Sequence, residues 1–233
     1  MPTEYFEQRE RALLGQRYEQ LYAAPQQTAE RGVTVSALRA APEQFAAQAD
    51  FPVEPSPFCK AAFVVHQPDF KPGRHPYHHA GVFYSQEPSA SSAAPLLGVQ
   101  PGMRVLDLCA APGGKTILLA EQMQGTGELY SCDAAENRVG LIRTAVDRMG
   151  FTGVHTLCND ATKPNPALPM ADRILTDVPC SGLGILAKKP DLRYKKLEAA
   201  RQAELLATQA AILDTAAALL KAGGRLVYST CTI

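Results

Sequence analysis

The sequence lacks several features that mark particular classes of protein. Its 23 Lys and Arg balance 23 Asp and Glu, so no overall positive field indicates a nucleic-acid partner. No apolar run approaches the roughly 18 residues that a membrane-spanning helix needs. The amino terminus, MPTEYFEQRERALLG, is charged and has no apolar segment typical of a secretory signal peptide. We expect a cytoplasmic protein with no membrane partner, and we also expect a monomer.

Cysteine and histidine patterns typical of metal sites are absent as well. No two of the six cysteines form a C-x-x-C pair, which disfavours a zinc knuckle or a disulfide framework and fits a reducing compartment. His75, His78 and His79 lie close together in the sequence, but the further Cys or Asp ligands of a metal site are missing nearby. We therefore interpret these histidines as locally hydrogen-bonded and predict no metal.

What the chain does contain is typical of a globular protein. It has 233 residues, of which 46% are hydrophobic and 20% charged. This length suits one large domain, or one domain with a small appendage. The charges are uneven, because the segment from Ile185 to Arg201 holds six Lys or Arg against Asp191 and Glu198. On charge alone, this segment is either the solvated start of a helix or a contact for an anionic partner.

The hydrophobic pattern changes along the chain. Residues 1 to about 50 have helical spacing, and residues 51–80 are rich in proline, with a short strand predicted at 62–65. From about residue 100, strands alternate with helices, which predicts an α/β fold with a doubly wound parallel sheet. The predicted strands are 103–108, 128–133, 154–160, 172–177 and 224–231, and the predicted helices are 114–123, 135–149 and 197–221. The sequence stops just past the fifth strand, so we expect it to be part of a longer protein.

Polar side chains follow the predicted strands in register. Asp107, Asp133, Asp160 and Asp177 stand at four successive strand ends, and Cys231 stands at the fifth. In open α/β sheets, ligands bind outside the carboxyl ends of the strands. A single Asp after a strand is common in turns, but four in register indicate a binding site at this edge.

The stretch VLDLCAAPGGKT, Val105 to Thr116, permits two interpretations. It ends like a phosphate-binding P-loop, G-x-x-x-x-G-K-[ST], but Cys109 stands where that pattern has its first glycine. The small residues of the stretch allow its backbone to approach a ligand closely. Asp133 is placed to accept hydrogen bonds from ribose hydroxyls. An acidic edge suits S-adenosylmethionine, whose tail carries no phosphate, better than it suits a nucleoside triphosphate.

Two cysteines stand in polar surroundings at neighbouring strand ends. Cys180 lies in DVPCSG and Cys231 in STC, and the strand order predicts that their thiols are close in space. We interpret both as exposed, functional thiols. Cys109, Cys132 and Cys158 are interpreted as buried structural cysteines.

These motifs resemble the NOL1/NOP2/Sun family of RNA cytosine-5 methyltransferases, in particular its bacterial ribosomal-RNA branch. The resemblance is close from Gly73 to the end of the chain and loose over residues 1–72. It departs from the family pattern in RGVTVSALR, which lacks the Asn of an Arg-x-Asn element, and in the absence of strands after YSTCT. The matching stretches are GRHPYHHAGVFYSQEPSA, DLCAAPGGKT, DAAENRV, ND, DVPCSG and YSTCT.

The resemblance implies a Rossmann-like class I methyltransferase sheet with a small N-terminal α+β domain. Residues 1–72 would form a mostly helical RNA-binding region, and residues 73–233 would form the S-adenosylmethionine-dependent core. The implied reaction is methylation of carbon 5 of a cytosine in RNA, most simply ribosomal RNA. The target base would be single-stranded or flipped out of its helix.

The resemblance also implies roles for individual residues. Cys231 would be the nucleophile, Cys180 would assist product release, and Asp177 would contact the base and the cofactor. Asp133 would hold the ribose and Asp160 the adenine amine. The remaining implied cofactor-binding residues are Cys109, Ala110, Ala111, Pro112, Gly113, Gly114, Lys115 and Arg138.

Three alternatives stay open at this point. The RNA could be a transfer RNA, since the sequence names neither the RNA nor the cytosine. The chain could be a catalytically silent RNA-binding module of the same fold, although PCSG and STC are intact. It could also be a P-loop nucleotide hydrolase, which the missing first glycine disfavours.

Overall fold

The computed structural model describes residues 4–22, 30–189, 191–192 and 198–232. The chain forms two compact units. The first unit contains Met1–Ala29, Val178–Ala211 and Thr230–Ile233, and the second contains Glu30–Asp177 and Ile212–Ser229. Within the described ranges, every helix is too short or too polar to cross a membrane.

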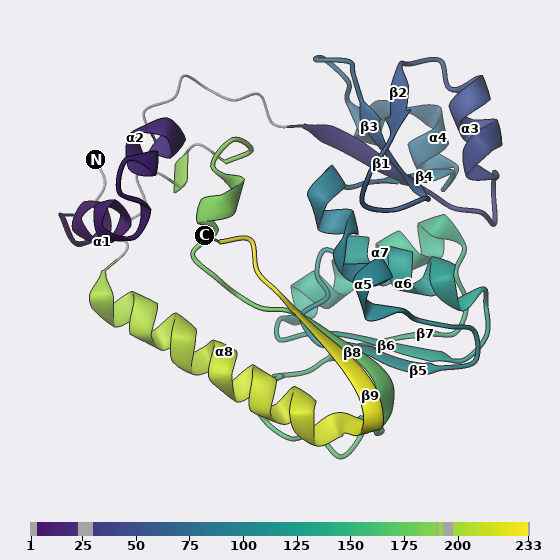
Figure 1. Ribbon diagram of the computed structural model, residues 1–233. Helices are drawn as coiled ribbons and strands as arrows, with labels where there is room; N and C mark the ends of the chain where they lie inside the picture. Colours follow the sequence, from purple (N-terminus) through teal and green to yellow (C-terminus); the bar gives the residue numbers. More distant parts are fainter. Residues whose placement is uncertain (1–3, 23–29, 190, 193–197, 233) are drawn as a thin grey trace. The chain divides into compact units, whose positions relative to one another are not determined.

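A parallel five-stranded sheet is the centre of the second unit (Figure 1). Its order is β7-β6-β5-β8-β9, and every neighbouring pair is parallel, as the alternating pattern predicts. The most buried strand, β5, is central, and β9 lies at an edge of the sheet. The strands are β5 (Arg104–Asp107), β6 (Glu128–Asp133), β7 (Val154–Cys158), β8 (Ala171–Asp177) and β9 (Leu220–Ser229).

Helices cover both faces of this sheet, which confirms the doubly wound, Rossmann-like fold. On one face lie α5 (Ala93–Leu97), α6 (Gly114–Met123) and α7 (Glu136–Met149), and the last turns of α8 (Ala199–Leu219) cross the other (Figure 1). The apolar residues of α7 recur at helical spacing, so they form one buried stripe. The core between sheet and helices includes Val105, Leu129, Leu175, Ile117, Ile142 and Val146.

A small antiparallel sheet precedes the parallel one in the same unit. Its order is β2-β3-β1-β4, and it packs with α3 (Pro42–Gln48) and α4 (Pro76–His79) around five phenylalanine rings. Its strands are β1 (Arg31–Val35), β2 (Val53–Pro55), β3 (Ala62–Val65) and β4 (Phe83–Ser85). Short 3₁₀ turns follow at Pro72–Arg74 and Pro88–Ser91. The N-terminal α+β domain and the strand at 62–65 are confirmed.

The prediction of helix over residues 1 to 50 is correct only in part. Helices α1 (Glu4–Leu14), α2 (Arg17–Tyr22) and α3 form, but Arg31–Val35 is a strand between two others. The helical spacing came from residues 6–22, whereas RGVTV has the β-branched residues of a strand. Strand β4 pairs with β1 although it follows residue 72, and the domain division at that residue stays a prediction.

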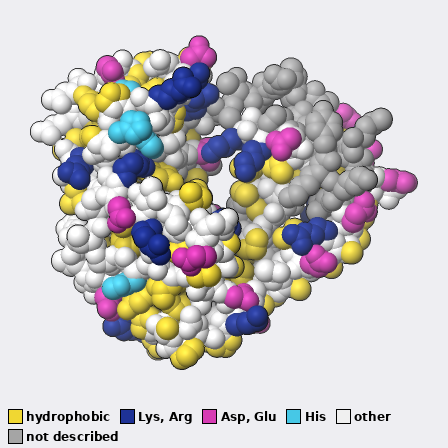
Figure 2. All heavy atoms as spheres, turned by 180° about the vertical axis from the view of Figure 1, so that it is seen from behind, with side chains coloured by type: hydrophobic (Ala, Val, Ile, Leu, Met, Phe, Trp, Pro, Cys, Tyr) yellow, Lys and Arg dark blue, Asp and Glu magenta, His cyan; other side chains and the backbone are white. Residues whose placement is uncertain are grey.

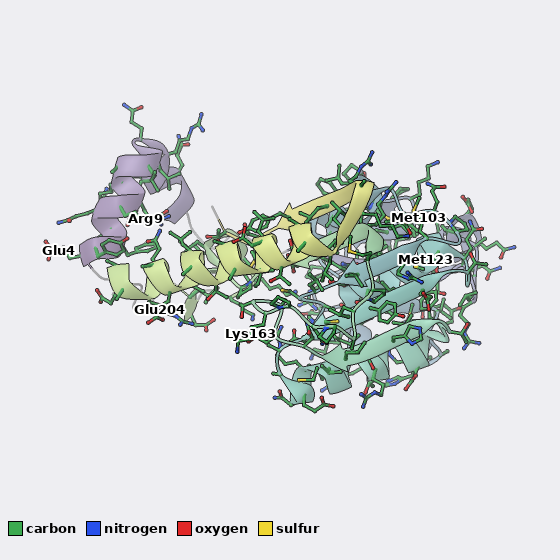
Figure 3. The ribbon with its side chains drawn as sticks, turned by 90° about the horizontal axis from the view of Figure 1, so that it is seen from below. Glu4, Arg9, Met103, Met123, Lys163 and Glu204 are labelled. Carbon is green, nitrogen blue, oxygen red and sulfur yellow. The ribbon has the colours of Figure 1, made fainter. Side chains whose placement is uncertain are left out.

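The first unit is built from segments far apart in the sequence. Helix α1 lies beside the first turns of α8 (Figure 3), where the Tyr5 hydroxyl donates to Gln202 Oε1 at 2.7 Å. Phe6 packs against Leu183 of the 3₁₀ turn Leu183–Ile185. Of the predicted basic segment, Lys188 and Lys189 are exposed and Arg201 pairs with Glu204. Its residues Arg193, Lys195 and Lys196 lie outside the described residues.

Charges of both signs are interspersed on the face shown in Figure 2, as the zero net charge predicts. Local ion pairs account for several of them, such as Arg104 with Glu128 at 2.8 Å. This face therefore presents no single-sign field that could by itself select an anionic partner.

Phe83→Ala should destabilise the second unit by about 3–5 kcal/mol, because the fully buried Phe83 ring contacts several other aromatic rings of the small sheet. Urea unfolding monitored by circular dichroism measures this change. Phe58→Ala is the matched control, since Phe58 is 46% exposed and should cost below about 1 kcal/mol. Equal losses for both variants would show that this aromatic core does not contribute to stability.

Candidate cofactor and nucleophile sites

The carboxyl edge of the parallel sheet carries the four predicted aspartates at different depths. Asp107, Asp133 and Asp177 end β5, β6 and β8, and Asp160 follows β7 by two residues. Asp107 is fully buried and Asp133 is 3% exposed, whereas Asp160 is exposed and Asp177 is half-buried. Only Asp160 and Asp177 therefore present much of their surface to solvent.

The loop between β5 and α6 has a backbone that requires glycine at two positions. Gly113 has a φ of 110°, which side chains rarely adopt. At Gly114 the φ is ordinary, but a Cβ would lie 3.1 Å from Tyr84 Cε1 and 3.2 Å from Gln86 Nε2. The Ala110 amide donates to the Cys132 carbonyl at 2.8 Å, which fastens the loop to β6. The structure thus holds this loop tightly before any ligand binds.

Arg138 links Asp133 to this loop. Its guanidinium lies 3.2 Å from Asp133 Oδ2 and donates to the Ala111 carbonyl at 3.0 Å. The other Asp133 oxygen accepts a hydrogen bond from the Ala135 amide at 3.3 Å. Arg138 therefore contacts two other residues predicted to hold the cofactor, Asp133 and Ala111.

Beneath them, Asp107 belongs to a buried polar network. Its Oδ2 accepts from the Thr116 hydroxyl at 2.8 Å, and Ser131 donates to Thr116 at 3.1 Å. Its Oδ1 has no hydrogen-bond partner among the described residues. Burial raises the pKa of Asp107 to about 7, and the hydrogen bond from Thr116 opposes that rise.

Asp177 is held from two sides. Lys115 of α6 donates to its Oδ2 at 2.7 Å, and Ser229 at the end of β9 donates to its Oδ1 at 2.8 Å. Both carboxylate oxygens therefore accept a hydrogen bond, which holds the side chain in one orientation. Lys115, predicted as part of the cofactor loop, therefore points its ammonium group at this carboxylate.

The two thiols predicted to be functional lie together in the first unit. The Sγ atoms of Cys180 and Cys231 are 3.1 Å apart, so the predicted proximity is confirmed. This separation exceeds the roughly 2.05 Å of a disulfide bond. The hydroxyls of Ser181 and Thr232 lie 2.5 Å apart, and the Gly184 amide donates to the Cys231 carbonyl at 2.9 Å. These contacts hold the two cysteine segments against each other.

The remaining predicted cysteines differ in exposure. Cys132 is buried and Cys109 half-buried, and burial raises the pKa of each thiol to about 12. Both stay protonated, as expected for structural cysteines. The prediction that Cys158 is buried is wrong: it is exposed, because it ends the edge strand β7, which has a neighbour on one side only.

Asp160 is engaged by its own loop. It accepts from the Thr162 hydroxyl at 2.6 Å and the Thr162 amide at 3.1 Å, and it pairs with Lys163, which is labelled in Figure 3. The hydrogen bonds from Thr162, followed by that from Lys163, lower the pKa of this carboxyl. The adenine contact predicted for Asp160 stays a prediction.

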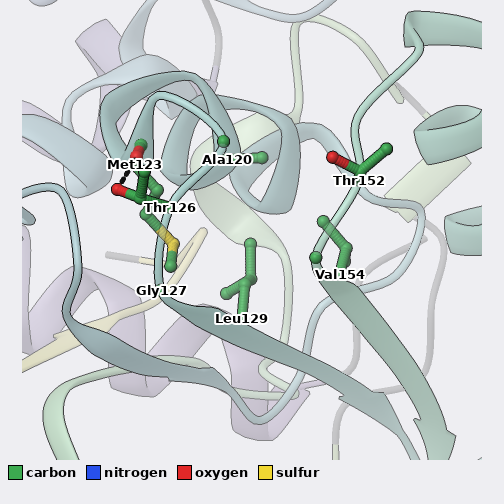
Figure 4. A pocket seen from close by; sticks show the side chains of 9 residues that line it. Ala120, Met123, Thr126, Gly127, Leu129, Thr152 and Val154 are labelled. Carbon is green, nitrogen blue, oxygen red and sulfur yellow. Dashed lines mark hydrogen bonds between the residues drawn. The ribbon is translucent and has the colours of Figure 1, made fainter.

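The pocket in Figure 4 lies away from these residues. Leu129 and Val154, which line it, stand at the amino ends of β6 and β7, whereas the predicted site residues stand at the carboxyl ends. Among the described residues, no group of three His, Cys, Asp or Glu is arranged to hold a metal. His75 instead caps α4 by accepting from the Tyr77 amide, and it contacts Asp50.

Sequence reasoning did not assign several residues that the structure places at the loop and at Asp177. Ser229 stood within the recognised STC motif, and its place at a strand end was a signal that could have found it. Thr116 ends the GGKT stretch and serves the buried network. Tyr84 donates to the Pro112 carbonyl from a strand of the other sheet, at 3.3 Å, and no sequence pattern signals that contact.

Comparison with known proteins identifies the family. A family model described as 16S rRNA methyltransferase RsmB/F matches residues 94–233, and a model of the N-terminal domain of 16S rRNA methyltransferase RsmF matches residues 1–88. The chain belongs to this RsmB/F methyltransferase family. The resemblance to the NOL1/NOP2/Sun family and its bacterial ribosomal-RNA branch is thereby confirmed.

Individual RsmB/F relatives match nearly the whole chain. The ribosomal RNA small subunit methyltransferase F of Enterobacter sp. (strain 638) is 34% identical over 245 residues, covering 100% of this chain and 50% of the relative. The protein of the same name from Escherichia coli O157:H7 is 33% identical over 227 residues, covering 93% and 47%. The chain thus spans about half the length of these relatives.

Solved structures agree with the fold. A methyltransferase homolog protein from Pyrococcus horikoshii is 28% identical, with a TM-score of 0.84 over 99% of this chain and 74% of its own. NSun6 from Pyrococcus horikoshii, solved with SFG, is 19% identical, with a TM-score of 0.87 over 100% and 84%. This second likeness bears on the fold alone.

Asp107→Asn should gain stability relative to the parent chain as the pH rises. The folded chain, with a pKa of about 7, keeps the Asp107 proton above pH 4, whereas the unfolded chain, with a pKa near 3.8, loses it. The parent chain therefore loses stability as the pH rises toward 7, and the variant has no such group to titrate. Between pH 5 and 8 the difference should change by roughly 3 kcal/mol, at about 1.4 kcal/mol per pKa unit. Urea unfolding at both pH values measures it.

Asp160→Asn is the control for this measurement. Because the pKa of Asp160 is lowered rather than raised, its contribution is lost only as the pH falls toward that pKa. Its stability difference from the parent chain should stay constant between pH 5 and 8. A constant difference for Asp107→Asn as well would show that Asp107 is ionised in the folded chain across this range.

Proposed function

We propose that this chain contains the S-adenosylmethionine-dependent catalytic part of an enzyme that methylates carbon 5 of a cytosine in small-subunit ribosomal RNA through a covalent cysteine adduct. The observation that carries the proposal is the pair of thiols 3.1 Å apart. Membership in the RsmB/F family and the names of the relatives support the ribosomal target. A cytoplasmic location would follow from that target.

The residues at the carboxyl edge fit S-adenosylmethionine better than a triphosphate. Asp133 and Asp177 lie close enough to Cys109 of the loop to act on its thiol, and the cations beside them, Arg138 and Lys115, are paired with these carboxylates rather than with a polyanion. The lysine that would reach phosphates in a P-loop is already paired with Asp177. The loop from Cys109 to Lys115 would hold the methionine part, Asp133 with Arg138 the ribose, and Asp160 the adenine. When bound, this cofactor supplies an electrophilic methyl group on a positively charged sulfur.

The thiol pair would provide the nucleophile that activates carbon 5 of cytosine. Carbon 5 of cytosine is a weak nucleophile, and addition of the Cys231 thiolate to carbon 6 would make carbon 5 enamine-like and reactive. Carbon 5 would then take the methyl group from the sulfonium as the bond from methyl carbon to sulfur breaks. Loss of the carbon-5 proton to a base and elimination of the Cys231 thiolate from carbon 6 would restore the aromatic ring. Covalent catalysis of this kind divides one difficult step into easier ones. Cys180, with its sulfur next to that of Cys231, is placed to assist the elimination.

Asp177 would contact the base during this cycle. Its carboxylate is oriented by Lys115 and Ser229, and it precedes Cys180 by three residues. An ionised carboxylate would accept hydrogen bonds from the protonated ring nitrogen 3 and the exocyclic amine, where positive charge develops after thiolate addition. The exposed Lys188 and Lys189 would contribute to the path of the RNA backbone.

Two other functions remain as outcomes of experiment. A transfer RNA could be the substrate, and a catalytically silent RNA-binding module would keep the fold without transferring a methyl group. Bisulfite sequencing of ribosomal and transfer RNA, from cells with and without the gene, distinguishes them. A cytosine in small-subunit ribosomal RNA should become bisulfite-sensitive when the gene is lost. A change confined to transfer RNA, or no change at all, would select one of the alternatives.

Asp133→Ala should weaken binding of S-adenosylmethionine by roughly 1–3 kcal/mol, because it removes an acceptor for ribose hydroxyls and the partner of Arg138. Titration calorimetry with the purified chain measures this loss. Glu128→Ala is the matched control, since this carboxylate stands at the opposite end of the same strand. ATP should produce no heat of binding with the parent chain. Tight binding of ATP and none of S-adenosylmethionine would restore the P-loop interpretation.

The two thiol variants should fail differently. Cys231→Ala should abolish turnover with no adduct, whereas Cys180→Ala should methylate the base and then remain attached to the RNA through Cys231. Denaturing gels would show Cys180→Ala as a slower protein–RNA band, and the double variant should lose that band. Cys158→Ala, which removes an exposed thiol, should behave as the parent chain. A band in Cys231→Ala and none in Cys180→Ala would exchange the two roles.

A further inference from the structure

Strand β4 of the small sheet reaches the cofactor loop of the large one. Its central residue, Tyr84, donates from its hydroxyl to the Pro112 carbonyl at 3.3 Å. Tyr84 and Gln86 also close the space above Gly114, where a Cβ would lie 3.1 Å and 3.2 Å from their atoms. All these residues belong to the same compact unit. One hydrogen bond therefore holds the backbone of Pro112, and two side chains fill the space that a side chain at position 114 would need.

Tyr84 is itself fixed by Arg148 of α7. The Arg148 guanidinium lies over the Tyr84 ring, 5.6 Å from its centroid, and donates to the His78 carbonyl at 2.5 Å and the Phe83 carbonyl at 3.3 Å. Burial raises the pKa of Tyr84, so its hydroxyl stays a hydrogen-bond donor at neutral pH. The ring therefore has little freedom to leave the loop.

Gln86 is fixed from the opposite side. Its Oε1 accepts from the Thr34 hydroxyl of β1 at 2.9 Å, and its Nε2 donates to the Ala90 carbonyl at 3.3 Å. Its backbone amide donates to the Gly32 carbonyl at 3.0 Å. Since both ends of its amide group are hydrogen-bonded, the Gln86 side chain is held in the space next to Gly114.

We propose that Tyr84 and Gln86 are positioning residues for the cofactor loop, and that they fix the backbone of Pro112 and Gly114 in the shape that binds the methionine part of S-adenosylmethionine. The inference rests on the proposed function. A preformed loop lowers the entropic cost of binding, so loosening it should weaken cofactor affinity without changing the chemical step. Tyr84 and Gln86 lie within the stretch GRHPYHHAGVFYSQEPSA, for whose residues no role was predicted.

Tyr84→Phe tests the proposal because it removes only the hydroxyl that holds Pro112. Titration calorimetry with S-adenosylhomocysteine, the demethylated product, should show roughly three- to tenfold weaker binding, as expected for one lost hydrogen bond. In a methyl-transfer assay, KM for the cofactor should rise by a similar factor, while kcat at saturating cofactor and KM for RNA should not change. Thermal unfolding of each variant shows that it is folded.

Tyr130→Phe is the matched control. Tyr130 also donates from its hydroxyl at 3.3 Å, but to Glu128 of its own strand β6. It should bind the cofactor product as tightly as the parent chain. Gln86→Met, which keeps the side-chain length but loses both hydrogen bonds, should weaken binding as Tyr84→Phe does, and it replaces that variant if Tyr84→Phe is not folded.

The outcomes separate this inference from the proposed function. Parent-like affinity in folded Tyr84→Phe and Gln86→Met would overturn the positioning role, while methyl transfer by the parent chain would still support the function. A uniform loss, in which kcat and cofactor affinity fall and KM for RNA rises, would indicate a purely structural role and would also overturn it. A parent chain that binds neither S-adenosylmethionine nor its product would contradict the proposed function itself.

Discussion

The carboxylate of Asp177, at the end of β8, ties two further elements of the second unit together. Lys115 ties it to the start of α6, and Ser229 ties it to the end of β9. Both segments that carry the paired thiols leave the sheet next to these residues, since Val178 follows Asp177 and Thr230 follows Ser229. The hydrogen bond from the Ser229 hydroxyl to the Asp177 carboxylate holds together the two points at which the chain leaves the sheet. Loss of the Lys115 ammonium would release α6 from Asp177, and loss of the Ser229 hydroxyl would release the end of β9; each loss would leave one carboxylate oxygen without that hydrogen bond.

Repulsion among the aspartates at the carboxyl edge of the sheet is reduced in two ways, by ion pairs and by a raised pKa. Asp177 is neutralised by Lys115, and Asp133 by Arg138. Asp107, deepest of the four, has no cation of its own, and burial moves its pKa to about 7. A protonated Asp107 would remove one negative charge from the floor of the site. The sheet thus places several acidic groups at adjacent strand ends without an equal number of buried cations.

Sequence reasoning predicted those features that depend on local pattern and strand order. The alternation of apolar segments gave the five parallel strands, and strand order alone brought Cys180 next to Cys231. It was wrong at β1, where the helical spacing of residues 6–22 was extended to a segment that forms a strand. It was also wrong at Cys158, whose exposure depends on the position of β7 at the edge of the sheet. It could not predict the contact of Tyr84 with Pro112, because two separate sheets must be packed before those residues meet.

The first unit is assembled from segments far apart in the sequence, which has a consequence for folding during synthesis. Helices α1 and α2 are made before the other described elements, but Tyr5 bonds with Gln202, 197 residues later in the chain. Before that partner exists, the whole segment Glu30–Asp177 of the second unit is made. The amino-terminal helices must wait, with apolar side chains such as Phe6 still unburied. Contacts of such high sequence separation form slowly, so these helices gain their partners late in folding.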